Sequence, residues 1–285
     1  MKKIRTVIFG AGQTGKTLSG ILNSKNYKVI AFIDNNKSLH GSMLCNTPVY
    51  HADEIKEIAP DLVFIAVLGA ERDADIIRQL NESGISAEKI KSIEEIRNLF
   101  DLRSGFMKLC ADEIEKRGIC GAVAELGVYQ GDFASDINAA FPERALYLFD
   151  TFEGFDVRDI SVEREYHFSK AEEGDFSDTN IDYVKKRLSN ADNTIFVKGY
   201  FPDTVVSIEE KFAFVSIDAD LYQPVYEGLR FFYPRMTRGG YILIHDYNNS
   251  RFRGVSEAVD RFCGEENIFL MPLCDIHGSA VIIKM

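Results

Sequence analysis

The chain has 285 residues, of which 46% are hydrophobic and 27% charged, a length that predicts two domains with a core each. Its 33 basic and 44 acidic residues give a formal net charge of −11, which argues against a general nucleic-acid-binding protein. No apolar run approaches the ~20 residues that would span a membrane. Five scattered cysteines without a Cys-x-x-Cys pair disfavour a disulfide framework or a zinc site, so we expect a reducing, cytoplasmic location.

The acidic residues are unevenly distributed along the chain. Residues 1–100 hold 13 basic and 12 acidic side chains, whereas the remainder holds 20 basic and 32 acidic ones. Such an asymmetry indicates two units with different ligands. We therefore predict a first domain over residues 1–100 and a second over residues 101–285.

Short apolar runs alternate with helical patterns in the first hundred residues. The runs cover residues 6–9, 28–33 and 61–67, and a helical pattern or an acidic helix separates each from the next. Strand–helix–strand alternation with apolar strands predicts a parallel, doubly wound α/β sheet.

A glycine-rich turn follows the first of these runs. Gly10, Gly12 and Gly15 form a G-x-G-x-x-G motif that opens a helix, and Asp34 follows nineteen residues after the last glycine. This context is typical of a dinucleotide-binding turn, in which the helix N-terminus receives a pyrophosphate and the acid holds a ribose. The alternative is that the glycines serve only strand–helix packing.

The sequence after this motif resembles a known module. In the run from Tyr27 to Tyr50, Phe32-Ile33-Asp34 is followed by Gly41 and by Thr47-Pro48-Val49. This pattern is similar to the N-terminal nucleotide-sugar-binding domain of bacterial sugar acyltransferases and polysaccharide-biosynthesis epimerase/dehydratases. The resemblance covers about residues 4–95 and implies a Rossmann-like domain that binds a nucleotide sugar or NAD(P). No Tyr-x-x-x-Lys pair follows within this region, which disfavours a working dehydrogenase.

A second strand–glycine turn begins the second domain, with different chemistry. Glu125 ends an apolar run before Gly127 and Gly131, and Asp150 ends the next run. An acid beside a glycine turn and a second acid on the following strand suit a ligand with a ribose and a cationic amino-acid tail. S-adenosylmethionine has both. The alternative is that the two acids cap helix N-termini.

Polar side chains follow two later strands. The run 212–217 ends at Asp218 and Asp220, and the run 241–244 ends at His245 and Asp246. Adjacent parallel strands deliver such residues to one edge, where open α/β sheets bind their ligands. Converging carboxylates repel unless a cation or a proton intervenes. Oxygen ligands favour Mg²⁺, Ca²⁺ or Mn²⁺, and a histidine favours Mn²⁺ or another transition metal. Alternatively, one acid caps a helix and the histidine is a structural hydrogen-bonding residue.

Six motifs in a fixed order resemble the macrocin O-methyltransferase family, which tailors the sugars of tylosin and mycinamicin. They read ELGVYQG (125–131), FDTFEGF (149–155), GDFSDT (174–179), KGYFPDT (198–204), SIDADLY (216–222) and GGYILIHDY (239–247). The resemblance covers about residues 105–285. It implies a class I methyltransferase sheet with an antiparallel last strand, S-adenosylmethionine as methyl donor, and a divalent metal, usually Mg²⁺, that grips sugar hydroxyls.

The resemblance also implies roles for the residues that match its motifs. The cofactor residues fall on Glu125, Gly127, Gly131 and Asp150. The metal ligands fall on Asp218, His245 and Asp246, with His245 standing where the family has an acid. The departure leaves the third ligand open and frees His245, whose pKa is expected near neutrality, as a general base. Asp218 and Asp220 are the other candidate bases.

A long acidic insertion separates the second and third strands of this domain. Residues 153–182 hold ten acids and three bases, which is typical of a lid or a substrate loop, or simply of a solvated surface. Tyr166 and His167 within it are candidate substrate contacts. Arg251 and Arg253 are candidate contacts for an anionic group on the acceptor, or ordinary surface charges.

Together these patterns predict a metal-dependent O-methyltransferase that acts on a sugar, whether as a nucleotide sugar, a polysaccharide or a glycosylated metabolite. We expect a homo-oligomer. One alternative is an NAD(P)-dependent oxidoreductase centred on the first glycine turn. Another is a non-catalytic protein that senses nucleotides through the first domain.

Overall fold

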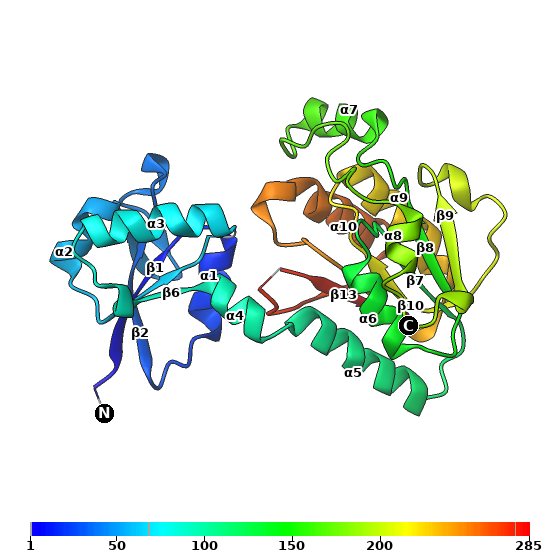
Figure 1. Cartoon of the computed structure of the whole chain (residues 1–285), viewed down its shortest axis with the longest axis horizontal. Coiled ribbons are helices and arrows are strands. Elements are labelled where there is room, and N and C mark those ends of the chain that lie inside the picture. The colour runs from blue at the N-terminus through cyan, green and yellow to red at the C-terminus, as the bar shows by residue number, and fades with distance from the viewer. Residues whose placement is uncertain (1, 68, 277) are drawn as a thin grey trace. The chain divides into compact units, whose positions relative to one another are not determined.

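The computed structural model describes residues 2–67, 69–276 and 278–285, and the chain divides into two compact units, residues 1–101 and 102–285 (Figure 1). Each unit is an α/β sheet with helices against it, as expected for a doubly wound fold. Among the described residues, none of the helices is both long and apolar enough to cross a membrane.

The first unit contains a six-stranded sheet in the order β3-β4-β2-β1-β5-β6. Its strands are β1 (Ile4–Phe9), β2 (Tyr27–Ile33), β3 (Met43–Leu44), β4 (Thr47–Tyr50), β5 (Leu62–Ile65) and β6 (Ile90–Ser92). Its helices are α1 (Gln13–Ile21), α2 (Ile55–Ile58), α3 (Ala70–Glu82) and α4 (Ile93–Leu99). All pairings are parallel except that of β3 with β4.

The predicted apolar runs are the three central strands of this sheet. Their carboxyl halves are completely buried because helices cover both faces of a parallel sheet, and Phe9, Ile33 and Ile65 belong to one core cluster. The doubly wound architecture predicted for this unit is therefore confirmed. The outer strands β3 and β4 at one side of the sheet and β6 at the other are too short to show as apolar runs in the sequence.

The second unit contains a seven-stranded sheet in the order β12-β13-β11-β10-β7-β8-β9. Its strands are β7 (Ala122–Leu126), β8 (Leu146–Asp150), β9 (Thr194–Lys198), β10 (Phe212–Ile217), β11 (Met236–Ile244), β12 (Met271–Pro272) and β13 (Ala280–Ile283). Strand β13 is antiparallel to β11, as predicted for the last strand, while β7 to β11 pair in parallel.

Six helices flank this sheet in the described part of the unit. They are α5 (Leu102–Lys116), α6 (Asp132–Ala140), α7 (Val157–Tyr166), α8 (Ile181–Lys185), α9 (Tyr222–Phe232) and α10 (Arg253–Glu266). All of the residues of the central strand β10 are buried, and they contribute to both core clusters, Phe212 to one and Phe214 to the other. This two-sided burial leaves chemistry to the residues that follow the strands, at the carboxyl edge of the sheet.

Candidate active site

Two acids and a histidine converge where β10 and β11 end. The parallel register pairs Ile217 with Ile244, so the next residues, Asp218 and His245, lie side by side. His245 Nδ1 lies 2.9 Å from Asp218 Oδ1 and 3.3 Å from Asp246 Oδ2. One ligand atom from each residue falls within 4.8 Å of the others. An ion with bonds of about 2.0–2.6 Å can bridge that span, so the predicted metal ligands fit a divalent cation.

Arg103, which no sequence motif marked, lies against this cluster. From the first turn of α5, its Nη1 donates a 2.7 Å hydrogen bond to Asp218 Oδ2, and its Nη2 donates a 3.0 Å bond to the Ser216 hydroxyl. Its guanidinium carbon lies 3.7 Å from the centroid of the Phe133 ring. The residue is 8% exposed, so this is a buried ion pair at the candidate metal centre.

The buried charges alter the pKa values of this cluster. Burial alone would lower the pKa of His245, but the charges of Asp218 and Asp246 outweigh burial and raise this pKa to about 10. Burial alone would raise the pKa of Asp218, but Arg103 and His245 hold it well below its usual range. Asp246 has a lowered pKa because His245 likewise outweighs its burial. The near-neutral pKa expected for His245 is therefore not found in the protein alone.

Two further acids have pKa values shifted the other way. Burial and the charges of Asp218 and Asp246 raise the pKa of Asp220 well above its usual range. Burial raises the pKa of Glu125 as well, although the charge of Arg103 opposes it. Glu125 is 1% exposed, and its Oε2 has no hydrogen-bond partner among the described residues. A buried carboxylate oxygen without a partner is an acceptor available to a ligand.

The glycine turn after β7 is shaped by the acid of the neighbouring strand. Asp150 Oδ2 accepts hydrogen bonds from the amides of Val128 (2.7 Å) and Tyr129 (3.0 Å), and its Oδ1 accepts one from Phe152. A Cβ atom on Gly127 would lie 2.1 Å from the carbonyl oxygen of Asp218, and φ at this glycine is +84°. The turn therefore packs directly against the loop that carries the candidate metal ligands.

Helix α6 follows this turn with an open N-terminus. Its N-cap, Gly131, has φ +78° and makes no side-chain capping bond, and a Cβ at this position would collide with Val184. Asp150 binds turn amides instead of capping the helix. The capping alternative for Asp150 is thus not what the structure has.

The first unit uses its glycine motif differently at each position. A Cβ on Gly15 would lie 1.9 Å from the carbonyl oxygen of Gly10, which makes Gly15 a packing requirement. A Cβ on Gly12, at the N-cap of α1, would meet no atom within 4 Å. Asp34 accepts hydrogen bonds from the amides of Ala11 and Asn36, both at 2.8 Å. The motif therefore combines a packed glycine with one open position at a helix N-terminus.

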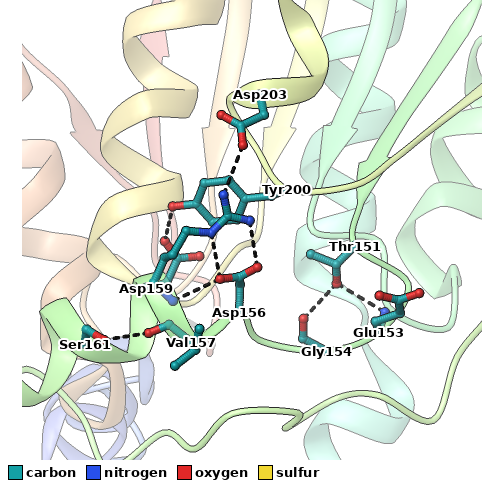
Figure 2. Close-up of polar contacts among 10 residues, drawn as sticks. Thr151, Glu153, Gly154, Asp156, Val157, Asp159, Ser161, Tyr200 and Asp203 are labelled. Atoms are coloured by element: carbon teal, nitrogen blue, oxygen red, sulfur yellow. Dashed lines mark hydrogen bonds and ion pairs between the residues drawn. The ribbon is translucent and has the colours of Figure 1, made fainter.

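The acidic insertion, residues 153–182, is anchored to the rest of the second unit at its first helix turn (Figure 2). The guanidinium of Arg158 lies 3.3 Å from the ring centroid of Tyr200 and donates hydrogen bonds to Asp156 and Asp203. Tyr200 donates a 2.8 Å hydrogen bond to Asp159, whose pKa burial raises to about 6. These contacts join α7 to the loop after β9.

A second contact joins the same insertion to the candidate site. Buried Glu163 accepts a 2.8 Å hydrogen bond from the amide of Tyr222, the first residue of α9, two positions after Asp220. Pro224, also in the first turn of α9, has no backbone N–H and therefore needs no acceptor. The insertion is thus packed onto the helix that follows the candidate catalytic acids.

The remaining candidate contacts have separate environments. Tyr166 is 58% exposed and stacks on Phe168, which in turn stacks on Tyr222. His167 is exposed and ends α7 in the left-handed conformation. Arg253 forms an ion pair with Glu257 one helical turn later. Arg251 lies over the Phe252 ring and is exposed.

The chain matches two family models. Residues 101–284 match the family described as macrocin-O-methyltransferase (TylF), and residues 2–91 match one described as C2185-like, N-terminal. The second description names no ligand, so nucleotide binding by the first unit stays a prediction.

Curated relatives match about three fifths of this chain. Mycinamicin III 3''-O-methyltransferase of Micromonospora griseorubida is 26% identical over 198 residues, which cover 64% of this chain and 75% of the relative. The 8-demethyl-8-(2,3-dimethoxy-alpha-L-rhamnosyl)-tetracenomycin-C 4'-O-methyltransferase of Streptomyces olivaceus is 24% identical, covering 61% of this chain and 70% of the relative.

Solved structures share the fold at lower identity. Calicheamicin methyltransferase CalS11 superposes with a TM-score of 0.55 at 22% identity, covering 76% of this chain and 94% of that one. The O-methyltransferase NovP superposes with a TM-score of 0.52 at 20% identity, covering 64% and 79%. The methyltransferase sheet predicted for the second unit is therefore confirmed.

Proposed function

The chain belongs to the macrocin-O-methyltransferase family and is an S-adenosylmethionine-dependent O-methyltransferase, and from this premise we propose that it methylates a hydroxyl of a sugar with the help of a divalent metal. The observation that carries the proposal is the convergence of Asp218, His245 and Asp246 beside the glycine turn after β7. The names of two relatives support a sugar acceptor. They describe methylation at the 3''- and 4'-positions, and one of them includes a rhamnosyl group.

We propose that Glu125, Gly127, Gly131 and Asp150 surround the methyl donor. The unpartnered Oε2 of Glu125 is an acceptor for its amino group, and Asp150 holds the glycine turn through the amides of Val128 and Tyr129. S-adenosylmethionine supplies an electrophilic methyl group on a sulfonium. The protein orients the acceptor hydroxyl opposite that group, because displacement requires an in-line approach.

Asp218, His245 and Asp246 are the residues that would hold Mg²⁺ or Mn²⁺. Such an ion polarises a bound hydroxyl and lowers its pKa. The mixed set of two carboxylates and one imidazole suits Mn²⁺ at least as well as Mg²⁺. The charges of Asp218 and Asp246 raise the pKa of His245 and favour its protonated form in the protein alone. A metal ion would bind only the neutral imidazole, so its binding would compete with this proton.

Asp220 is the base that we assign to the acceptor proton. Its raised pKa makes its carboxylate a stronger base than that of Asp218, whose pKa is lowered by Arg103 and His245. Its φ of +58° places it in the left-handed region, in which non-glycine residues at functional sites are often held.

Transfer of a labelled methyl group from S-adenosylmethionine tests this proposal. The acceptor panel holds nucleotide sugars, free glycans and glycosylated metabolites, each with Mg²⁺, with Mn²⁺ and with a chelator. We expect transfer to one sugar class, lost with the chelator and restored by added metal. Transfer that is unaffected by the chelator would contradict the metal, and transfer only to non-sugar phenols would contradict the acceptor.

For the first unit, residues 1–100, we propose a nucleotide-sugar or NAD(P) ligand at the helix N-terminus behind Gly12. The open space at Gly12 and the uncapped start of α1 support it, because a pyrophosphate needs both free amides and close backbone approach. Thermal shift with nucleotide sugars and NADH tests it. Stabilisation by NADH alone, with hydride transfer, would favour an oxidoreductase. Nucleotide binding in a chain without methyl transfer would favour a sensor.

A further inference from the structure

Arg103 is the buried cation at the candidate metal centre, and neither motif nor strand end accounts for it. It lies at the second position of α5, 115 residues before its partner Asp218, in the segment that joins the second unit to the first. Only 8% of the residue is exposed. A buried arginine is costly unless its hydrogen bonds and its charge are matched. The identity of its partners therefore shows what the side chain does.

Three contacts fix the plane of the Arg103 guanidinium. The Phe133 ring lies against one face at 3.7 Å, and the Ser216 hydroxyl accepts from Nη2 at 3.0 Å. The remaining contact is the 2.7 Å bond from Nη1 to Asp218 Oδ2. Ser216 lies in β10, two residues before Asp218. Arg103 therefore binds both a residue of the strand and the acid that follows the strand.

This arrangement divides the two oxygens of Asp218 between two neighbours. Oδ2 is held by Arg103, whereas Oδ1 faces His245 Nδ1 at 2.9 Å. The terminal torsion of an aspartate is broad, so an unrestrained carboxylate would rotate between many orientations. The bond to Oδ2 selects the orientation in which Oδ1 points into the cluster formed with His245 and Asp246.

We propose that Arg103 is a positioning residue that fixes Asp218 so that Oδ1 is presented, together with His245 and Asp246, to a divalent cation. This inference rests on the proposed function, because it assigns these three residues to a metal. A guanidinium suits the role because it is planar and holds two acceptors and a ring face at once. A lysine ammonium supplies the charge but not the plane.

The test replaces Arg103 and measures Mn²⁺ affinity by electron paramagnetic resonance, without an acceptor. We expect Arg103→Met to weaken Mn²⁺ binding about 10- to 100-fold, the range typical of lost outer-shell partners. Arg103→Lys should recover only part of the loss. Unchanged affinity would overturn the proposal. So would tighter binding, because it would mean that the guanidinium competes with the ion for Asp218. If Arg103→Met does not fold, Arg103→Lys alone decides, with the same two contradicting outcomes.

Arg144→Met is the matched control. Arg144 also makes two hydrogen bonds from a largely buried guanidinium, but to the backbone carbonyls of Gly121 and Ile119 at 2.7 and 2.9 Å. This variant should lose stability while keeping Mn²⁺ affinity. S-adenosylmethionine affinity, measured by calorimetry, should be the same for the wild type and for Arg144→Met.

The two proposals fail in different ways. Normal Mn²⁺ binding, lost in Arg103→Met, without transfer to any sugar would overturn the acceptor and support the role of Arg103. A wild-type protein that transfers methyl groups but binds no Mn²⁺ would overturn the role of Arg103 and the metal while leaving sugar methylation standing.

Discussion

The two sheets share one arrangement at their carboxyl edges: a glycine turn follows one strand, and an acidic residue lies at the end of the next strand. In both, that acid accepts amide hydrogen bonds from the turn, Asp34 in the first unit and Asp150 in the second. The next strands differ. Beyond β10 and β11, charged side chains converge on Asp218 and bury a cation against it. The shared turn is thus part of the fold, whereas the proposed metal site is formed by residues outside the turn.

The largest expected effect is a loss of kcat on substitution of Asp218. It tests whether this acid accounts for the difference between the carboxyl edges of the two sheets. Asp218→Asn keeps the shape but removes the charge that holds Arg103 and His245, so we expect kcat to fall by about 10²- to 10³-fold. S-adenosylmethionine affinity, measured by calorimetry, should change little. The control is Asp61→Asn, which changes an acid hydrogen-bonded to the Arg5 amide in the first unit. Full turnover in Asp218→Asn would place the reaction elsewhere.

A substitution in the second glycine turn tests how closely that turn packs on the metal loop. Gly127→Ala places a Cβ 2.1 Å from the Asp218 carbonyl oxygen at a positive φ. We expect a loss of about 3 kcal/mol or more in the free energy of unfolding, since neither backbone can yield without moving the other. Denaturant unfolding measures it. A loss below about 1 kcal/mol would mean that the two loops are not in contact in solution.

A pH titration of stability tests the anchor of the acidic insertion. The pKa of Asp159 rises from 3.8 to about 6 on folding, chiefly through burial. The native state therefore binds the proton more tightly, and its stabilising contribution is complete below pH 4 and lost as the pH rises through 6. The loss amounts to about 2–3 kcal/mol. In Asp159→Asn this pH dependence should disappear, whereas Asp156→Asn, at a group of lowered pKa, should retain it.

The smallest expected effect on stability falls on the first glycine turn. Gly12→Ala adds a Cβ that meets no atom within 4 Å, at a φ of −86° that alanine readily adopts. We expect less than about 1 kcal/mol of destabilisation, as usual for glycine and alanine at an N-cap. Nucleotide-sugar or NADH binding should be lost if a pyrophosphate lies there. Retained binding with unchanged affinity would show that the ligand avoids this helix.

The sequence predicts residues that follow directly after buried strands. It does not predict residues whose role depends on contacts with distant parts of the chain. The apolar run 212–217 predicts a buried strand, which places Asp218 at its carboxyl end, because a buried strand and its direction are local properties of the sequence. Arg103 could not be found this way, since its partner is 115 residues away and its own segment reads as a polar helix. The pKa of His245 depends on acids from two strands and on burial, so the residue type alone could not indicate the direction in which it is shifted.

The anchors of the acidic insertion have a consequence for protein engineering. Among the contacts of residues 153–182 with the rest of the second unit, Arg158 faces Tyr200 and Asp203, and Glu163 binds the amide of Tyr222. An exchange of this segment between homologues must therefore transfer its partners in the 198–204 motif along with it. The contact of Glu163 is easier to keep in such an exchange, because its partner is a backbone amide rather than a particular side chain. At the far end of the insertion, Thr179 and Asp178 bind Tyr129 and Gln130 of the glycine turn after β7, so an exchange must also keep this turn compatible.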